Sequence, residues 1–443
     1  MTSRMGAAAG AAALLVLVAP VRAQHGHAGE SADTTNVWMM RSAGGWAAMG
    51  MAQVFPTYTW SLPATEGTPL ERQGVYATQA AAMVNVASPD NRFVLRTTLN
   101  FEAWTQRGGE LTYGGWGEGF IDKRHPHTLL HELMLSVNVF RSDGMRASVS
   151  AGKGFTPYGT DDPMSRPVLK YPTNHHLSQI VERWTLNGVL ATESWSFEAG
   201  VFSGNEPTGP YDLGNTDAFG RSWSARVTRR FGSPIAGSRA WEVSASAGRV
   251  MERQHDAVTR TILLNAALRH EQAYPFGRLY ALAEFSVSEP GSGDGHYAAV
   301  LEGSLRRGDA QPYFRVERAT RPEYERNGTA DTRGFFRYDH HAEATGASRW
   351  TIVSAGLGWT ATRLPVSVRP YAEAQYHAVS RHRGTLDPAR LYGRSRFWAF
   401  SAGFRIFVGG DPMRMGAYGV LDPMTIGHGG VPDDTATQGT ERH

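Results

Sequence analysis

The sequence predicts an all-β fold: a transmembrane up-and-down antiparallel β-barrel of about 16 strands, preceded by a cleaved N-terminal signal peptide. Three observations on the 443 residues predict it. The N-terminus has the pattern of an export signal. Apolar and polar residues then alternate along most of the chain. Finally, the connections between the alternating segments are short and long in turn.

A secretory signal peptide is expected over residues 1–23. Arg4 provides a short positive region, Ala7–Val18 forms an apolar run, and Pro20 breaks that run. Val21-Arg22-Ala23 then places small residues at the two positions that a signal peptidase recognises, so cleavage is expected after Ala23. The apolar run is shorter than the roughly 20 residues that a membrane-spanning helix needs, which disfavours an anchor.

The composition excludes a helical membrane protein. Mean hydropathy is −0.36, and no segment after the signal approaches the roughly 18 unbroken apolar residues of a spanning helix. The chain has no cysteine, but it has 12 Trp, 16 Tyr, 19 Phe and 50 Gly, which in an exported protein favours a barrel. The formal net charge is +3, and loss of Arg4 and Arg22 with the signal leaves the mature chain close to neutral, so no nucleic-acid partner is expected.

Side chains of alternating polarity predict the strands. The clearest example is Arg92–Gln106, in which apolar residues occupy every second position and polar residues the positions between. The polar set there is Arg96, Thr98, Asn100 and Glu102. The same pattern recurs at residues 278–287, 297–306 and 398–408. In a barrel the apolar face contacts lipid and the polar face points into the lumen.

The connections indicate which ends of the strands lie together. Short links rich in Asp, Asn, Gly and Pro occur, for example, at Ser88–Asn91, Arg141–Gly144 and Gly308–Gln311. Longer polar stretches such as Arg107–Thr128 and Thr156–Ser178 lie between them. Outer-membrane barrels have short periplasmic turns and long outer loops, so both ends of the barrel are expected in the periplasm. A barrel of about 16 strands is wide enough for an aqueous lumen.

The expected organisation has four parts. Residues 1–23 are the signal peptide, 24–45 a polar leader, 46–408 the barrel and 409–443 a C-terminal tail. The tail is rich in Gly, Pro, Met and Thr, and the sequence leaves open whether it lies in the periplasm or folds into the lumen.

Charged residues of both signs are predicted to line the pore. They could form a field that selects ions, or pair across strands in a closed barrel. The predicted pore-lining residues are Arg96, Glu102, Arg278, Glu284, Glu302, Arg306, Arg369, Glu373 and Arg405.

Clustered histidines suggest a metal site at the mouth of the barrel. Imidazole suits copper and zinc, and neighbouring outer loops converge there. The candidate ligands are His125, His127, His131, His175 and His176. The alternative is that these histidines stabilise the loops by bonding to backbone carbonyls and to carboxylates such as Glu182. His25 and His27 in the leader could also bind copper, although a flexible leader is the simpler interpretation.

No catalytic signature is found, so no enzymatic activity and no catalytic residue are expected. The sequence has no phosphate-binding glycine loop with its lysine and no G-x-S-x-G motif. His131-Glu132 begins a zinc-protease pattern, but Leu135 stands where the second ligand is needed. An outer-membrane lipase is a remaining alternative, with His270 and His377 on strands.

Four stretches carry a resemblance to a family of uncharacterised bacterial outer-membrane barrels, which covers most of the mature chain up to about Val408. They are Asp122-Lys-Arg-His-Pro-His127, Pro163-Met-Ser-Arg-Pro167, His175-His176 and Gly204-Asn-Glu-Pro207. The resemblance implies a porin-like fold and an outer-membrane location. Where the family tends to carry ligand-type side chains, this chain has residues such as Thr128, Ser165 and Leu177, which favours a packing role for these loops.

The expected function is passage or gating of a small polar solute or ion across the bacterial outer membrane. The partners would be the lipid bilayer, the solute, and the outer-membrane assembly machinery during folding. No cofactor is required, although copper or zinc could bind. The alternatives are a copper- or zinc-handling surface protein and a structural barrel with a plugged lumen.

Overall fold

The computed structural model describes most of the chain after the leader. The described residues are 38–42, 44–62, 73–106, 128–142, 144–160, 163–166, 171–173, 175–205, 207, 209–235, 238–254, 257–291, 295–324, 344–361, 366–385, 387, 393–409 and 414–426. They belong to one unit, Asn36–His443. The predicted signal peptide lies outside the described residues.

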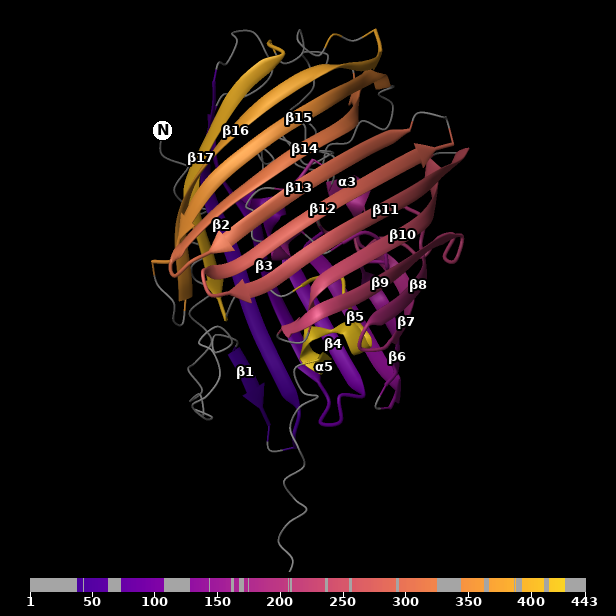
Figure 1. Cartoon of the computed structure of the whole chain (residues 1–443). Coiled ribbons are helices and arrows are strands. Elements are labelled where there is room, and N and C mark those ends of the chain that lie inside the picture. The colour runs from indigo at the N-terminus through magenta and orange to yellow at the C-terminus, as the bar shows by residue number, and fades with distance from the viewer. Residues whose placement is uncertain are drawn as a thin grey trace, which may run out of the picture. The chain divides into compact units, whose positions relative to one another are not determined.

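Antiparallel strands make up nearly all of the regular secondary structure in the described residues (Figure 1). The strands are β1 (Trp38–Arg41), β2 (Ala47–Leu62), β3 (Gln73–Ala87), β4 (Phe93–Asn100), β5 (Leu130–Arg141), β6 (Arg146–Gly154), β7 (Arg183–Ala191), β8 (Trp195–Phe202), β9 (Ser222–Ile235), β10 (Ser238–Gln254), β11 (Ala257–Tyr274), β12 (Gly277–Pro290), β13 (His296–Arg306), β14 (Ala310–Tyr324), β15 (Ala344–Trp359), β16 (Val366–Gly384) and β17 (Arg396–Val408). The short helices are α2 (Glu102–Thr105), η1 (Pro163–Ser165), α3 (His175–Ser178), η2 (Gly419–Leu421) and α5 (Pro423–Ile426). No helix among these is long and apolar enough to cross a membrane.

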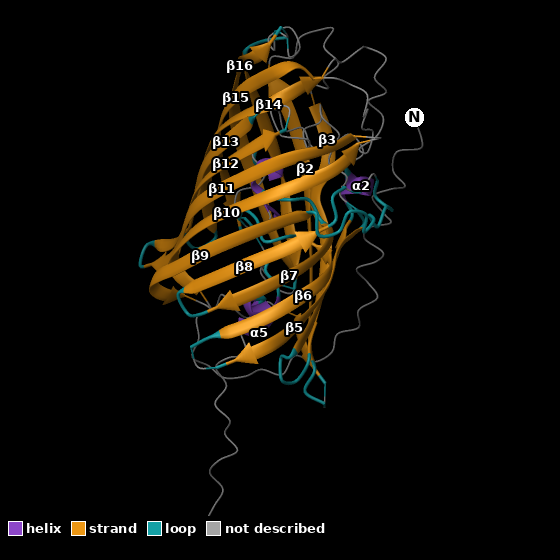
Figure 2. Ribbon diagram, turned by 90° about the vertical axis from the view of Figure 1, so that its right-hand side faces the viewer, coloured by secondary structure: helices purple, strands orange, loops and turns teal. Residues whose placement is uncertain are grey.

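Within the described residues, β2 to β17 close into a ring of sixteen strands. Each strand pairs with the next along the chain (Figure 2). The last strand, β17, pairs with β2 from Trp398↔Leu62 to Val408↔Ala52. The prediction of an all-β, up-and-down barrel of about 16 strands is confirmed. Closure leaves no strand edge unpaired in the ring, which a barrel in lipid requires because the bilayer core offers no hydrogen bonds.

One strand lies where only a leader was expected. β1 pairs with the beginning of β2, from Trp38↔Gly50 to Arg41↔Ala47. This register begins just beyond the last pair between β2 and β17, Val408↔Ala52. β1 therefore continues the sheet on the side of β2 that β17 no longer reaches, and the polar leader ends before residue 38 rather than at residue 45.

The outer wall is apolar and the inner wall is polar. On β12, Phe285 is 49% exposed, whereas its neighbours Glu284 and Ser286 are buried. On β17, Trp398 and Phe404 face outward while Ser401 and Arg405 are buried. Large exposed aromatic residues also lie toward both ends of the strands; those near the short turns include Phe93, Trp195, Phe276 and Trp359, and those near the long loops include Trp60, Trp223 and Trp398. Two aromatic girdles around an apolar band are typical of a transmembrane barrel.

The strand predicted over Arg92–Gln106 is shorter than expected. It ends at Asn100, and Glu102 begins the short helix α2. The cause is local, because the Asn100 side-chain oxygen accepts a hydrogen bond from the Glu102 backbone N–H at 2.8 Å. Asparagine often turns the chain in this way by bonding to the backbone two residues ahead. The turn directs Glu102 into the lumen.

Two segments that are not strands occupy the lumen. The first, called here the lumen loop, is the described part of Phe155–Glu182 between β6 and β7. Its helix α3 packs against β11 and β12. The second, called the C-terminal segment, is Arg414–Ile426, and its helix α5 contacts β3. The sequence left the place of the tail open, and the structure puts this part of it inside the barrel.

Candidate functional site

The candidate site is the lumen itself, where charged strand residues meet the lumen loop and the C-terminal segment. The loop is anchored by Arg166, which is 2% exposed. Its guanidinium lies 3.3 Å from Glu284 on β12 and 3.7 Å from Glu302 on β13. Glu302 also accepts hydrogen bonds from Arg315 at 2.7 Å and from the Tyr280 hydroxyl at 2.6 Å. A buried charge is tolerated only when it is paired and hydrogen-bonded, and this network meets both conditions.

Further bonds tie the lumen loop to a wide arc of the wall. Thr160 donates to Glu284 at 2.8 Å, and the Gly159 N–H donates to Ser246 on β10 at 2.8 Å. At the other end of the loop, both the backbone N–H and the hydroxyl of Thr173 donate to Glu317 on β14. The loop is thus docked against strands β10 to β14 by polar groups.

On the opposite wall, Glu102 contacts the lumen loop. Its carboxylate accepts hydrogen bonds from the Tyr171 hydroxyl at 3.1 Å and from the Gln79 N–H at 2.5 Å. The side chain of Gln106 donates to it at 2.7 Å. Glu102 lies in α2, outside the strands, and its burial raises its pKa to about 7, although these donors favour the charged form. It is therefore a lumen carboxylate that titrates near neutral pH.

The C-terminal segment fills the end of the lumen that has the short turns. Asp422 pairs with Arg96 of β4 at 2.9 Å, and both side chains are 1% exposed. The Tyr418 hydroxyl donates to Glu132 on β5 at 2.6 Å and accepts the Phe155 N–H at 2.9 Å. Burial raises the pKa of Asp422 despite the neighbouring arginine.

Other contacts extend this attachment around the wall. The N–H groups of Gly419 and Val420 donate to serines of β5 and β6. On the far side, Arg414 reaches Glu242 of β10 at 2.7 Å. Met424 packs with Val94 and with Met49. The segment is held by charge pairs, backbone hydrogen bonds and apolar contacts together.

The predicted pore-lining residues fall into three groups. Arg96, Glu102, Glu284 and Glu302 contact the two lumen segments, as described above. Arg369, Glu373 and Arg405 are buried on β16 and β17. Arg405 lies over the Phe55 ring at 4.7 Å and donates to the carbonyl of Arg166 at 3.2 Å.

The third group lies at the rim. Arg278 is 37% exposed and pairs with Glu271 at 2.8 Å beside the short turn between β11 and β12. Arg306 is its register partner on β13. These two arginines therefore line the rim at the short-turn end rather than the centre of the lumen. Sequence reasoning missed Arg166, Tyr418 and Asp422, because nothing in a loop or tail sequence marks the strand residues that it will meet.

The histidines do not converge on a metal site in the part that is described. His131 is fully buried, with its Nδ1 3.3 Å from Glu182. His175 bonds to Gln179 at 2.6 Å through Nε2 and stacks on Tyr171 with ring centres 4.8 Å apart. His125 and His127 lie outside the described residues, as does the His176 side chain.

Among the described residues, no group of three or more His, Cys, Asp or Glu is placed to hold a metal. The contacts of His131 and His175 are those expected of histidines that stabilise loops. Of the two strand histidines, His270 bonds to Tyr274, and His377 stacks on Phe397.

No family model and no curated protein matches the chain. The chain is similar to several solved structures of outer-membrane proteins. OmpT of Vibrio cholerae has a TM-score of 0.47 at 11% identity, covering 83% of this chain and 99% of its own. An anion-selective porin from Comamonas acidovorans has a TM-score of 0.46 at 10% identity, and the match covers 82% of this chain and 99% of the porin. OprB of Pseudomonas putida has a TM-score of 0.46 at 12% identity, and the match covers 82% of this chain and 94% of OprB.

The chain's own architecture defines its class. A closed ring of sixteen antiparallel strands, with an apolar outer wall between aromatic girdles and a polar inner wall, is an outer-membrane β-barrel of porin size. It lies in the bacterial outer membrane, in contact with the lipid bilayer. The resemblance to a family with His-Pro-His and His-His motifs stays a prediction.

Proposed function

We propose that this barrel passes a small polar solute or ion and that the lumen loop and the C-terminal segment together gate it. The observation that carries the proposal is the way the two lumen segments are held against the wall. Arg166 of the lumen loop and Asp422 of the C-terminal segment each form an ion pair with a charged strand residue of the inner wall. The wall itself is polar, as an aqueous passage requires and as a barrel with a permanent apolar core does not.

Charge pairs of this kind suit a gate. The attraction within a buried ion pair is largely offset by the cost of removing both charges from water, so its net contribution is small. When the segments leave, water solvates both partners again and recovers much of that cost. Release of Arg166 would expose Glu284 and Glu302 on β12 and β13, about a quarter of the ring away from Arg369 and Arg405 on β16 and β17. Charges of both signs that line a lumen bias which ions pass.

Single-channel recording in planar bilayers tests the proposal. We expect the wild type to give rare or small conductance steps and Asp422→Asn to give more frequent ones, because Arg96 loses its charged partner and the C-terminal segment loses one of the contacts that hold it. Glu271→Gln is the matched control, since it removes a carboxylate from an arginine pair at the rim that holds neither segment. It should conduct like the wild type.

A second variant guards against misfolding of the first. Arg166→Met keeps the bulk of the side chain but removes the charge that anchors the lumen loop, and it should raise the open probability independently of Asp422. Correct assembly is checked by the shift in gel mobility of folded barrels on heating. If the wild type and both variants are folded but show no conductance steps, the gating proposal is wrong and the barrel is a plugged structural one.

A further inference from the structure

An unusual concentration of methionine lies where the two lumen segments meet. One cluster of buried side chains contains Met83 of β3, Met134 of β5, Met164 of the lumen loop and Met415 of the C-terminal segment, and Met51 of β2 packs against it. Its remaining members are Phe155, Tyr171, Tyr418 and Ala81. Five of the chain's 14 methionines thus gather from five separate segments.

Methionine is less frequent in the other apolar clusters of the described part of the barrel. Met49 and Met424 share one of these clusters with Val94, whereas the cluster of Tyr158 and Phe202 is completed by Ile180, Val250 and Leu263. Leucine, isoleucine and valine, which have better-defined rotamers, are absent from the methionine cluster. Five thioethers in one cluster therefore give this part of the lumen several soft sulfur ligands.

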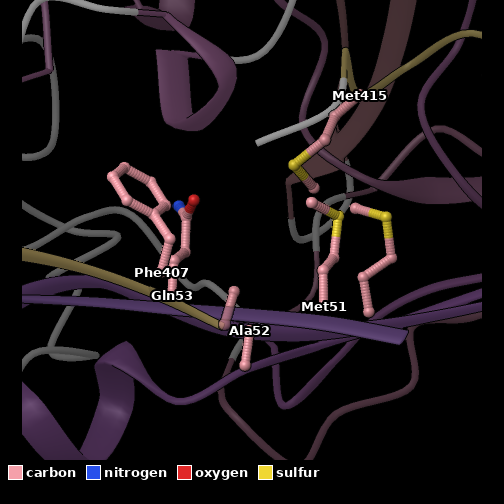
Figure 3. A pocket seen from close by; sticks show the side chains of 7 residues that line it. Met51, Ala52, Gln53, Phe407 and Met415 are labelled. Atoms are coloured by element: carbon pink, nitrogen blue, oxygen red, sulfur yellow. The ribbon is translucent and has the colours of Figure 1, made fainter. Parts of the chain in front are cut away.

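Three of these thioethers line one pocket. Met51, Met83 and Met415 form it together with Gln53 and Phe407. Figure 3 shows the side chains of Met51 and Met415 reaching toward each other, with Gln53 and Phe407 on the far side of the space. The sulfur of Met83 lies 3.9 Å from the Asn85 amide nitrogen, at the outer limit for a hydrogen bond to sulfur, so it is weakly held.

We propose that this pocket is a binding site for a soft monovalent metal ion, Cu(I), coordinated by the thioethers of Met51, Met83 and Met415. Thioethers are soft, neutral ligands that favour Cu(I) over hard divalent ions. The inference is separate from the proposed passage of solutes, because it concerns binding alone. It also differs from a histidine site, because no imidazole lines the pocket.

The surroundings of the pocket carry charges of both signs. Arg369 and Arg405 each lie 5.2 Å from the centre of the Phe407 ring, which lines the pocket. Tyr171 and Tyr418 belong to the same cluster as the methionines, and their hydroxyls donate to the carboxylates of Glu102 and Glu132. The ion would therefore be held by its sulfur ligands rather than by the charges around the pocket. Met415 belongs to the C-terminal segment, so a bound ion would also tie this segment to β2 and β3.

The test is a competition for Cu(I) under anaerobic conditions, with the full mature chain folded in detergent. The protein is titrated against the coloured Cu(I)–bicinchoninate complex, and the loss of colour gives the number of ions taken up. We expect the variant Met51→Leu/Met83→Leu/Met415→Leu to take up one ion fewer per chain than the wild type. X-ray absorption at the copper edge should show sulfur in the first shell of the wild type only.

Matched variants make the outcome decisive. Leucine conserves volume, so the triple variant should fold, because Met-to-Leu exchanges usually cost less than about 1.5 kcal/mol each. The control Met49→Leu/Met424→Leu changes two buried methionines of a neighbouring cluster and should bind like the wild type. Histidines outside the pocket are the same in all forms, so their binding cancels in the comparison. Equal uptake by the wild type and the triple variant would overturn the proposal, whatever the conductance experiment shows.

Discussion

At the scale of single residues, Glu102 is a side chain whose contacts help to arrange the lumen but cannot all be predicted from a sequence pattern. Alternation along a strand predicted that it lines the lumen, and the structure places it in the lumen from helix α2 instead of from a strand. Its actual place depends on Asn100, at which the strand ends two residues before Glu102, and on Tyr171, which lies 69 positions further along the chain than Glu102. The first signal is local and can be read in the sequence. The second depends on docking of the lumen loop, for which the sequence holds no local signal.

Glu102 also makes a pH-dependent contribution to stability. Its pKa rises from an ordinary 4.5 when unfolded to about 7 in the folded barrel, so the folded state holds the proton more tightly. Its stabilising contribution is therefore fully present below pH 4.5 and is lost as the pH rises through about 7. A shift of this size corresponds to about 3 kcal/mol. We expect urea unfolding in detergent to show wild-type stability declining over this pH range relative to Glu102→Gln.

Glu102→Gln is informative because the amide is neutral at every pH and keeps the shape of the side chain. Glu193→Gln, in the exposed turn between β7 and β8, serves as the control and should follow the wild type. If the wild type and Glu102→Gln keep a constant difference in unfolding free energy from pH 4 to 8, the carboxyl of Glu102 does not titrate as inferred.

At the scale of elements, the strands were predictable and the segments inside them were not. Alternation along residues 278–287 and 398–408 reflects a physical contrast between lipid and lumen that acts at every strand position. The content of the lumen leaves no such trace, because a serine or glutamate that faces water has the same pattern as one that faces a docked loop. This is why both an ion-selective pore and a closed barrel were consistent with the sequence.

The docking of the lumen loop depends on one glycine. Gly159 has a φ of +67°, and a Cβ placed on it would lie 1.5 Å from the carbonyl oxygen of Ser178 in the same loop. Gly159→Ala should therefore move the parts of the loop around Gly159 and Ser178 apart. This would weaken the hydrogen bonds from Gly159 to Ser246 and from Thr160 to Glu284. We expect faster proteolysis of the loop in the folded barrel. We also expect a larger decrease in the free energy of unfolding than the strain of a positive φ at an alanine would cause alone.

Gly220 separates these two effects. Its φ is +83°, but a Cβ there meets nothing within 4 Å. Gly220→Ala should cost roughly 1–2 kcal/mol, the ordinary penalty of a left-handed backbone for a residue with a Cβ. Equal losses of stability for the two alanine variants in urea titrations would show that the close approach of Gly159 to Ser178 does not matter for docking.

At the scale of the whole molecule, the account depends on lipid touching the outer wall. Leu264 lies near the middle of β11, is 51% exposed, and stands between Ala247 and Val287 on the neighbouring strands. An arginine there would place a charge in hydrocarbon, which costs about 2–4 kcal/mol at the bilayer midplane of such barrels. Leu264→Arg should lower the free energy of unfolding from lipid vesicles by this amount, as measured by tryptophan fluorescence in urea.

Leu213 provides the control, because it has the same residue type and nearly the same exposure, 52%, in the connection between β8 and β9. Water surrounds that connection if the barrel spans the bilayer as inferred, so Leu213→Arg should change the unfolding free energy by less than about 0.5 kcal/mol. The comparison tests the environment of the outer wall rather than the residue, since the substitution is identical at both positions. Equal effects of the two arginines would mean that β11 faces water, and the assignment of the outer wall to lipid would then be wrong.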